Sequence, residues 1–455
     1  MAPRYRYRQG GEFVDAEAYV RVSGSFLPVG SLPPTDPPPR SVMTLRGDPG
    51  FDATLLSSAQ QTRLSTMKAL IKRGTDDSRD PYQNARRDDI WWYSHDLRTN
   101  IGAQIIAFRA TGDMWFLDTI YELLDIMLYK REVSPGTALR LDTKYRGTCS
   151  TSGCATEGFD TGYLMWVHRQ NPNNAQRGTD LREDYDYATH ALVAQVAYML
   201  HHNRDLVSPE GYSYGARADW LRNYLLTHFE AKLRARWNKP SGFPIRNWPA
   251  QFDRYFAWSN WHYYMGLLTG NSAYTAEAQR MNALILNPAN LCSYSTATGT
   301  AYAFRRNAQF ITDGSGDYIC PSTYTQFPFM DVLDMYFQGF DVWVDPVHLE
   351  RFGRAITQRM MDNSNPVSNG LSACMAGGTT PCGWESREGS FTRVSAFIYQ
   401  NGTWGFLSPW DSSGDIAALN EVMRSHSQTQ AASNNTWDRT RLLAAQFLHE
   451  HLLST

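Results

Sequence analysis

Short turns that contain glycine divide much of the chain into segments of helical periodicity, and this punctuation restricts the fold more than any other feature. Thr111-Gly112-Asp113 separates the helical pattern of Trp91–Ala110 from that of Met114–Arg131. Thr269-Gly270-Asn271-Ser272 separates Trp261–Leu268 from Tyr274–Leu286 in the same way. Glycine ends a helix readily, and Asp, Asn or Ser caps the next one. The sequence therefore predicts helical hairpins joined by tight turns.

The same periodicity predicts further helices, for a total of about twelve. They are Ala53–Arg73, Tyr185–Asn203, Tyr214–Trp237, Thr325–Phe340, Pro346–Asp362, Phe391–Tyr399, Asp415–Ser425 and Trp437–Leu453. No long stretch alternates apolar and polar residues, so we expect few strands. Recurrent hairpins without strict sequence repeats favour an all-α fold, an (α/α) toroid or incomplete barrel of about six helical hairpins with long loops. An irregular α-solenoid is the alternative.

The chain divides into two unequal parts by composition. Residues 1–45 are rich in Pro and Gly and are predicted to form an extended N-terminal arm. Residues 46–455 are predicted to form a single toroid domain. The predicted loops at 132–184, 238–258, 287–324 and 363–390 are long for a compact domain, and long loops commonly build a site.

Composition and charge narrow the possible partners. The apolar fraction is 42%, the charged fraction is 19% and the net charge is −2. Such a chain is globular, and its balanced charge argues against nucleic acid or an anionic membrane as the main partner. No stretch is long and apolar enough for a transmembrane helix. The 14 Trp and 25 Tyr residues suit a long groove that stacks against sugar rings.

The six cysteines indicate the compartment. Cys149 and Cys154 lie close together in one polar segment, and Cys374 and Cys382 do so in another, while Cys292 and Cys320 remain. Local pairs of this kind are typical of disulfides, although six free thiols are the alternative. Residues 1–8 lack the apolar core of a signal peptide. We therefore expect a secreted or periplasmic protein from which a signal has been removed, and a monomer.

The segment Ser259–Tyr264 concentrates the groups that could carry chemistry. Asn260, His262 and Tyr264 supply an amide, an imidazole and a phenol. Ser259 or Asn260 is predicted to cap the helix that follows, so that Asn260 and His262 could converge on an anionic ligand at its N-terminus. The alternative is that Asn260 only caps the helix and His262 is a packed interior histidine.

Two other helical segments carry candidate residues. Asp186 and His190 are spaced to meet on one helix face, where the carboxylate would fix the imidazole tautomer. In Trp91–Asn100, an indole beside the guanidinium of Arg98 suits a sugar that carries a carboxylate. Ordinary core packing is the alternative in both segments. The predicted substrate-binding residues here are Trp91, Trp92, Arg98 and Asn100, with Tyr264 from the first segment.

The last candidates lie between residues 305 and 324. Arg305 and Arg306 are predicted to bind a carboxylate, although an exposed polar turn is equally compatible. Asp313-Gly314 begins a polar loop that leads through Tyr318 to Tyr324, which is predicted to lie in the first turn of the next helix. Tyr318 is a predicted substrate-binding residue, and Tyr324 is a predicted catalytic one. No spacing typical of metal ligands occurs, so no metal or other cofactor is expected.

With these residues in view, the chain resembles the toroid-fold polysaccharide lyases that act on alginate and related polyuronates. Asn260 and His262 match an Asn-His element that opens an inner helix, and Asp313-Gly314 followed by Tyr324 matches the second element of the family. The chain departs from the family pattern at two points. Trp261 separates Asn260 from His262, whose counterparts in the family are adjacent. The family's arginine a few turns before the Tyr is missing, and Arg305 or Arg306 would take its place. The resemblance implies a glucuronan- or mannuronan-directed relative.

The resemblance also implies a reaction, which is β-elimination in a 1,4-linked uronic-acid polysaccharide such as alginate or glucuronan. Asn260 and either His190 or His262, with an arginine, would neutralise the substrate carboxylate. Tyr324 would act as acid and, for one stereochemistry, as base, with either histidine as the alternative base. Two rival functions remain open at this stage. One is a toroid glycoside hydrolase, for which Asp184, Asp186, Asp313, Asp317, Asp331, Asp334 and Glu385 offer carboxylates. The other is a non-catalytic polysaccharide-binding protein.

Overall fold

Helices account for 79% of the part of the chain that the computed structural model describes, which confirms the predicted all-α class. The described residues are 5–9, 12–16, 19–22, 25–28, 54, 56–72, 80–87, 90–129, 140–141, 164–165, 183–208, 211, 213–231, 255–288, 290–304, 326–361, 371–372, 375, 393–394, 401–429 and 443–450. Most of their apolar side chains form one core that extends from the first helix to the last, and Leu419 and Met423 form a small second cluster. None of the helices among them is long and apolar enough to cross a membrane.

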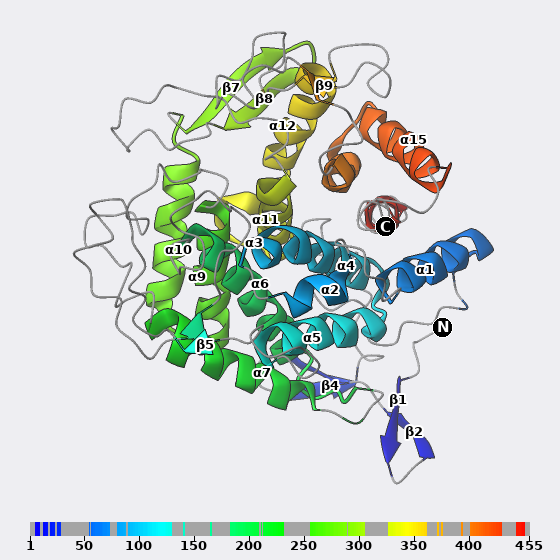
Figure 1. Cartoon of the computed structure of the whole chain (residues 1–455), viewed down its shortest axis with the longest axis vertical. Coiled ribbons are helices and arrows are strands. Elements are labelled where there is room, and N and C mark those ends of the chain that lie inside the picture. Colours follow the sequence, from blue (N-terminus) through cyan, green and yellow to red (C-terminus); the bar gives the residue numbers. More distant parts are fainter. Residues whose placement is uncertain are drawn as a thin grey trace.

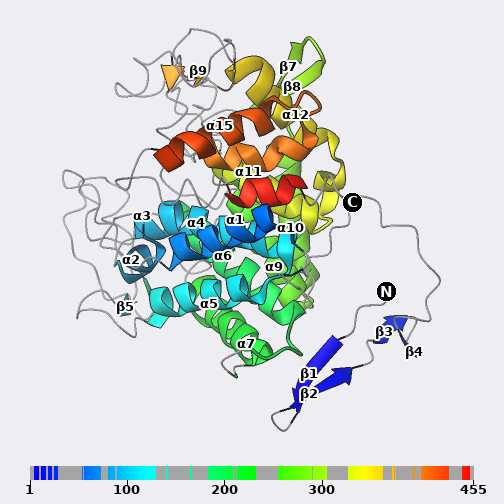
Figure 2. The same ribbon diagram turned by 90° about the vertical axis from the view of Figure 1, so that its right-hand side faces the viewer.

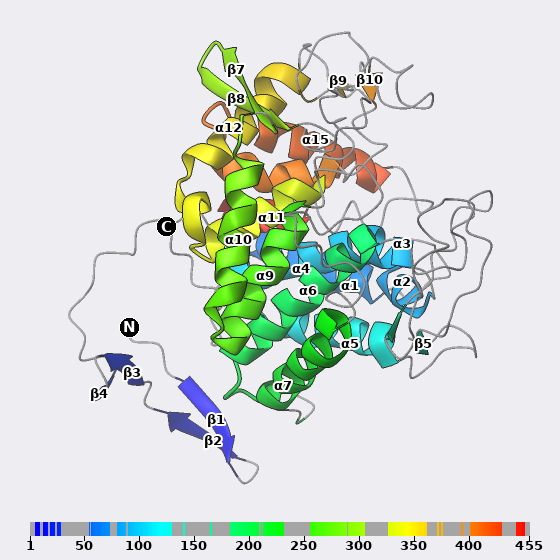
Figure 3. The same cartoon turned by 90° about the vertical axis from the view of Figure 1, so that its left-hand side faces the viewer.

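Helices that follow one another along the chain contact each other in pairs. These pairs are α4 (Arg98–Thr111) with α5 (Met114–Tyr129), α6 (Glu183–His202) with α7 (Tyr214–Tyr224), α9 (Tyr255–Thr269) with α10 (Ser272–Ile285), and α11 (Gln326–Phe337) with α12 (Val347–Ala355). In Figures 1, 2 and 3, α4, α6, α9 and α11 occupy the middle of the molecule, while α5 and α7 lie at one end and α12 at the other.

Further helical elements complete the body. They are α1 (Ser58–Ile71), α2 (Pro81–Arg86), α3 (Ile90–Trp92), the π-helices η3 (Tyr93–Leu97), η4 (Leu225–Glu230) and η8 (Ile356–Met360), the 3-10 helices η7 (Asp341–Val344) and η9 (Asn401–Trp410), α15 (Asp415–Thr429) and a helix over residues 443–450. The α1 helix begins with a capping box between Ser57 and Gln60. Its polar face meets residues 443–450, where Glu450 accepts hydrogen bonds from Gln60 and Arg63.

The two predicted hairpin turns have the same chemistry. Gly112 and Gly270 both have a φ of 71°, in the left-handed region that glycine adopts without strain. Before each glycine, the hydroxyl of Thr111 or Thr269 accepts a hydrogen bond from the residue two positions later, at 3.2 Å in both turns. After it, Asp113 or Asn271 accepts from the first turn of the next helix. These turns confirm the prediction of α4–α5 and α9–α10 as hairpins.

The start of α9 corrects the prediction for the segment Ser259–Tyr264. The helix begins at Tyr255 and not at Trp261, so Ser259 and Asn260 lie in its second turn and neither caps it. The residues from Tyr255 to Trp258 are buried and extend the apolar side of the helix toward its N-terminus. The Ser259 hydroxyl instead donates to Asn282 Oδ1 of α10 at 2.8 Å and links the two helices of the hairpin.

Strands occur where loops or a helix were expected. The predicted loop 287–324 contains the antiparallel hairpin of β7 (Leu291–Thr296) and β8 (Gly299–Phe304), which packs on α12. Every second residue of β7 is more exposed, which is the alternation of a strand with one face toward solvent. The predicted helix Phe391–Tyr399 is wrong, because β10 (Arg393–Val394) within it pairs with β9 (Leu371–Ser372).

The remaining strands are also short antiparallel pairs. Within the predicted N-terminal arm, β1 (Tyr5–Gln9) pairs with β2 (Glu12–Ala16), and β3 (Tyr19–Val22) pairs with β4 (Ser25–Pro28). In the predicted loop 132–184, β5 (Arg140–Leu141) pairs with β6 (Leu164–Met165). None of the sheets in the described residues has more than two strands.

Candidate functional site

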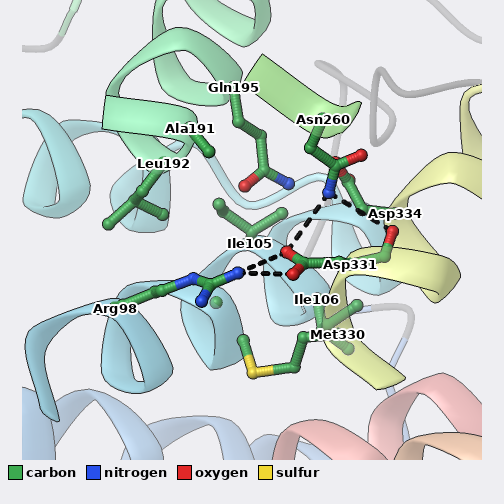
Figure 4. Close-up of a pocket in the computed structure, with 11 residues that line it drawn as sticks. Arg98, Ile105, Ile106, Ala191, Leu192, Gln195, Asn260, Met330, Asp331 and Asp334 are labelled. Atoms are coloured by element: carbon green, nitrogen blue, oxygen red, sulfur yellow. Dashed lines mark hydrogen bonds and ion pairs between the residues drawn. The ribbon is translucent and has the colours of Figure 1, made fainter. Parts of the chain in front are cut away.

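Four helices meet around a small cavity in the middle of the molecule. The cavity holds about 30 Å³ that a water-sized molecule can reach. One side of it is apolar and is formed by Gly102, Ile105, Ile106, Ala191, Leu192 and Met330. The other side is polar and is formed by Arg98, Gln195, Asn260, Asp331 and Asp334 (Figure 4). Each of the helices α4, α6, α9 and α11 contributes at least one polar group, so polar side chains from four separate helices meet at this cavity.

Asp331 of α11 brings two of the predicted site residues together. A single nitrogen of Arg98, Nη2, donates to both carboxylate oxygens of Asp331, at 2.5 Å and 2.6 Å. The amide nitrogen of Asn260 donates to the Oδ1 of the same carboxylate at 3.2 Å. Figure 4 shows the two donors reaching this carboxylate from different helices. All three residues are buried: Arg98 is 4% exposed, Asn260 is 4% exposed and Asp331 is 6% exposed.

Arg98 owes its position to an irregular helix. The π-helix η3 separates α3 from α4, and Arg98 is the first residue after it. A π-helical turn inserts an extra residue and so changes which side chains face inward; such turns are frequent at functional sites. Beyond this turn the guanidinium is directed into the core, toward α11. The sequence spacing alone would have placed Arg98 on the same stripe as Trp91 and His95.

A second buried ion pair lies one helical turn further along α11. Asp334 forms short contacts with Arg109 of α4 and with the hydroxyl of Tyr264 of α9. Gln195 of α6 also lines the cavity, and its side-chain amide lowers the pKa of this carboxyl group. Tyr264, a predicted substrate-binding residue, is fully buried and reaches the cavity only through Asp334. Its role in this structure is to hold α9 against α11.

Burial dominates the electrostatics of the cavity. Loss of solvent raises the pKa of both Asp331 and Asp334, while Arg98 and Arg109 respectively oppose that rise. Burial also raises the pKa of Tyr264, and the charge of Asp334 raises it further. Arg98 pairs with Asp331 and Arg109 pairs with Asp334, so the charges of these four buried groups balance when the carboxyl groups are ionised. The pairs therefore compensate charges that would be costly to bury alone.

His190 does not reach this cavity. As predicted, Asp186 and His190 meet on one face of α6, with an Oδ1–Nδ1 distance of 3.7 Å. The imidazole Nδ1 donates to the carbonyl oxygen of Asp186 at 2.8 Å, and its Nε2 lies 2.9 Å from the hydroxyl of Tyr224. Its ring stacks on Phe229 with 3.8 Å between the ring centroids. His190 is thus a packed interior histidine between α6 and η4.

His262 is also separated from the cavity, because of its helical phase. It lies two residues after Asn260, which in an α-helix corresponds to a rotation of about 200°. Its Nδ1 lies 3.0 Å from the carbonyl oxygen of Trp258, and its ring contacts the rings of Trp258 and of Tyr274 on α10. The expected convergence of Asn260 and His262 at a helix terminus therefore does not occur.

The tryptophans of the segment Trp91–Asn100 lie near the surface. Trp91 and Trp92 are both half-buried, and the Trp91 ring stacks on His95 with a centroid separation of 4.5 Å. The guanidinium of Arg87 lies 4.0 Å from the centre of the Trp92 ring. Asn100 is buried and accepts a hydrogen bond from Gln104 at 2.7 Å, and it does not line the cavity. Of this segment, only Arg98 reaches the cavity.

Several predicted residues lie outside the described residues. They are the catalytic candidate Tyr324, the substrate-binding candidates Arg305, Arg306 and Tyr318, and the cysteines Cys149, Cys154, Cys320, Cys374 and Cys382. Cys292 of β7 is described and carries a free thiol. The expected disulfides between Cys149 and Cys154 and between Cys374 and Cys382 fall on residues outside the described part and stay predictions. Among the described residues, no cluster of three or more His, Cys, Asp or Glu could hold a metal ion.

Two polar residues at or next to the cavity were not predicted from the sequence: Gln195 lines it, and Arg109 pairs with Asp334. Arg109 and Gln195 each lie within an apolar helix, where a charged or amide side chain needs a buried partner. In the sequence analysis, Asp331 and Asp334 are named only as possible carboxylates of a hydrolase. Their spacing of three residues in the otherwise apolar segment 326–337 was an available signal, because it places both carboxylates on one helix face.

Comparisons with known proteins add no family assignment. We compared the chain with protein-family models, with curated proteins and with solved structures, and no match was found in any of the three.

Proposed function

We propose that this protein is a polysaccharide lyase that cleaves a 1,4-linked polyuronate, such as alginate or glucuronan, by β-elimination. One observation carries the proposal. Arg98 and Asn260 come from two different sequence motifs, and each was predicted to contact a uronate. In the structure, both donate hydrogen bonds to the same carboxylate beside one cavity. A guanidinium and an amide held in this way are the donors needed to neutralise a sugar carboxylate before its neighbouring proton can leave.

Asp331 gives these donors their orientation in the absence of substrate. Its carboxylate fixes the guanidinium of Arg98 and the amide nitrogen of Asn260 relative to each other. The amide oxygen of Asn260 is buried and has no hydrogen-bond partner among the described residues, so it can accept a bond from a sugar hydroxyl. Donors that are already oriented lose little entropy when substrate binds, which favours catalysis.

Proton transfer is assigned to Tyr324 in this proposal. The imidazoles of His190 and His262 have packed environments on other faces of their helices, which argues against either as the base. Tyr324 precedes the first residue of α11, Gln326, by two positions, and α11 is the helix that carries both cavity carboxylates. A free phenol has a pKa of about 10, so a base role requires nearby cations. Arg305 and Arg306 remain the candidates for that role.

We also propose that the helical hairpins close into an (α/α) toroid. The supporting contacts run from α4 to α6, from α6 to α9, from α9 to α11 and from α11 to η9. Gln60 and Arg63 of α1 bond to Glu450 in the last described helix, which brings the first and last helices together. Polar residues of four central helices that face one cavity are the arrangement expected at the axis of such a ring. A secreted or periplasmic, monomeric enzyme remains part of the proposal.

A glycoside hydrolase is the second candidate, and one observation favours it. Asp331 and Asp334 both line the cavity, and burial raises the pKa of each, as a general acid requires. Against it, both carboxylates are engaged in buried ion pairs with arginines. A general acid needs to hold a proton, and a paired arginine favours the ionised form. The lyase is therefore the better supported of the two. A binding protein without catalytic activity would need neither arrangement.

Substrate chemistry separates these functions in one experiment. Polyuronates, and the same polymers with their carboxyl groups reduced to neutral alcohols, are incubated with the protein. A lyase forms a product that absorbs ultraviolet light, from the polyuronates only, because elimination needs the carboxylate and creates a conjugated double bond. Equal release of reducing ends from the neutral polymers, without absorbance, would replace the lyase with a hydrolase. Binding without either product would indicate a binding protein.

A matched pair of asparagines tests the site itself. Asn260→Ala removes an amide that lines the cavity, and we expect turnover to fall by about 10²–10³-fold, the usual effect of losing one such donor. Asn282→Ala removes an equally buried amide from α10, where it bonds to Ser259. We expect this control to retain turnover within a few-fold of wild type. Thermal unfolding of both variants reports on the fold, and equal turnover in the two would reject the proposed role of Asn260.

A further inference from the structure

Met330 closes the cavity from its apolar side. The side chain belongs to α11 and is half-buried, and it lines the cavity next to Asp331. Figure 4 shows it on the opposite side from Gln195 and Asn260, with its sulfur and terminal methyl group extended toward α4. The residue it meets there is Gly102.

The absence of a side chain at Gly102 makes this contact possible. A Cβ atom built at Gly102 would lie 1.6 Å from the terminal methyl carbon of Met330 and 3.4 Å from its sulfur. The methyl group of Met330 therefore occupies the space that any other residue at position 102 would fill with its own Cβ. Gly102 and Met330 form a notch and a plug, contributed by two helices that are far apart in the sequence.

The plugged cavity is too small for the proposed substrate. A cavity needs roughly 10–15 Å³ of such space to hold one water molecule, so about 30 Å³ accommodates about two. A sugar acid is several times larger. The polar side is fixed by two buried ion pairs, whereas Met330 is unbranched and has three rotatable bonds. Among the residues that line the cavity, Met330 is thus the one whose rotation can enlarge it at the lowest cost.

We propose that Met330 controls access to this cavity and must leave the notch at Gly102 before the carboxylate of a uronate can reach Arg98 and Asn260. This inference rests on the proposed function and names the residue that controls access to its site. Rotation of Met330 changes the fraction of molecules in which the cavity is open, so Met330 acts on the apparent affinity for the uronate. The fraction of molecules with an open cavity scales the apparent affinity.

The methyl group of Met330 can be observed directly. The protein is prepared with ¹³C-methyl methionine, and the Met330 signal is identified among the 15 methionines by its absence in Met330→Leu. Glucuronate is a monosaccharide and so has no glycosidic bond that the protein could cleave. It is added to the wild-type protein, with glucose as the neutral control. We expect glucuronate to shift the Met330 methyl signal and glucose to leave it unchanged. An unmoved signal at a glucuronate concentration that saturates binding would overturn the inference.

Affinity measurements on variants give the second test. Met330→Ala removes the plug, so we expect glucuronate to bind about ten-fold more tightly or better than to wild type, as measured by calorimetry. Met361→Ala, which truncates another half-buried methionine outside the cavity, should bind like wild type. Equal affinity of wild type and Met330→Ala would overturn the role of Met330. If turnover of polyuronates persists in that case, the proposed function stands without it; if neither binding nor turnover is found, both fail.

Discussion

Arg98 and Asp331, which are 233 positions apart in the chain, form an ion pair whose two side chains are only 5% and 9% exposed. The pair joins the start of α4 to the middle of α11. Asp331 also receives the amide of Asn260 from α9, so three helices depend on one carboxylate. Because buried charges are costly unless they are paired, this contact both fixes the helices and makes the junction sensitive to substitution.

Removal of one partner of this pair should destabilise the fold strongly. Arg98→Met leaves the Asp331 carboxylate buried without its main counter-charge, and we expect a loss of about 3–5 kcal/mol in the free energy of unfolding. The double variant Arg98→Met with Asp331→Leu should recover most of that loss. Lys72→Met is the control, because the Lys72–Glu122 pair is more than 40% exposed on both sides and should contribute less than about 1 kcal/mol. Urea unfolding measures all three, and equal losses for Arg98→Met and Lys72→Met would contradict the expectation.

Two adjacent tyrosines of α9 should differ in their contribution to stability. The hydroxyl of Tyr264 donates to the buried carboxylate of Asp334, whereas that of Tyr263 donates to the carbonyl oxygen of Gln338 at 3.1 Å. A hydrogen bond to a charged group is worth about 1.5–3 kcal/mol, and one between neutral groups about 0.5–1.5 kcal/mol. Tyr264→Phe should therefore destabilise the protein more than Tyr263→Phe in guanidinium unfolding. The reverse order would mean that Asp334 does not depend on Tyr264.

Close packing of α9 on α10 should make Gly266 intolerant of a side chain. A Cβ at Gly266 would lie 2.5 Å from the hydroxyl oxygen of Thr275 and 3.4 Å from its backbone nitrogen. Gly266→Ala should thus cost about 1–3 kcal/mol through overpacking. Gly266→Ala combined with Thr275→Ala should be more stable than Gly266→Ala alone. The second change removes the hydroxyl oxygen of Thr275 with which the new Cβ would clash. Thermal unfolding checks the order, and a double variant as unstable as the sum of its parts would exclude this clash as the cause.

His348 should make the protein less stable in mild acid. Burial lowers the pKa of His348, the charge of Arg351 lowers it further and Asp345 opposes the shift, while the hydroxyl of Tyr302 lies 3.1 Å from Nδ1. The unfolded chain therefore takes up a proton near pH 6.5, where the folded protein does not. The stabilisation from the neutral imidazole is complete above about pH 6.5 and declines as the pH falls from there toward the lower folded-state pKa.

The variant His348→Gln isolates this contribution. Its free energy of unfolding should depend less on pH than that of wild type between about pH 7 and pH 5, as measured by urea unfolding at each pH. Burial lowers the pKa of His201, His228 and His449 as well, so some acid sensitivity should persist in the variant. Identical pH profiles for wild type and variant would show that His348 does not titrate differently in the folded state.

The proposed acid–base role of Tyr324 predicts a loss of activity without a loss of fold. Tyr324→Phe removes the phenolic hydroxyl, and turnover of the best polyuronate should fall by about 10²–10⁴-fold, the usual contribution of a general acid or base. Binding of an oligouronate and the midpoint of thermal unfolding should change little. Turnover within a few-fold of wild type would assign the proton transfer to another residue.

The sequence was most informative where short-range interactions decide the structure. Both hairpin turns follow from a glycine in a left-handed conformation and a polar cap beside it, all within a few residues. The predicted start of α9 was wrong because the Ser259 hydroxyl bonds to Asn282 on α10 and does not cap the helix. A prediction from neighbouring residues cannot include a partner on another helix. The hairpin of β7 and β8 was missed because its alternation is too short to stand out from a loop.

The sequence by itself determined the helical class, the hairpin pairs and the presence of donors suited to a carboxylate. Only the tertiary structure decided which of those donors meet. A step of two residues along α9 turns His262 away from the cavity that Asn260 lines, and the π-helix η3 directs Arg98 inward. The partner of both donors, Asp331, comes from a helix hundreds of residues away from Arg98. Helix formation depends on neighbours in the chain, whereas the pairing of buried charges depends on how the finished helices pack.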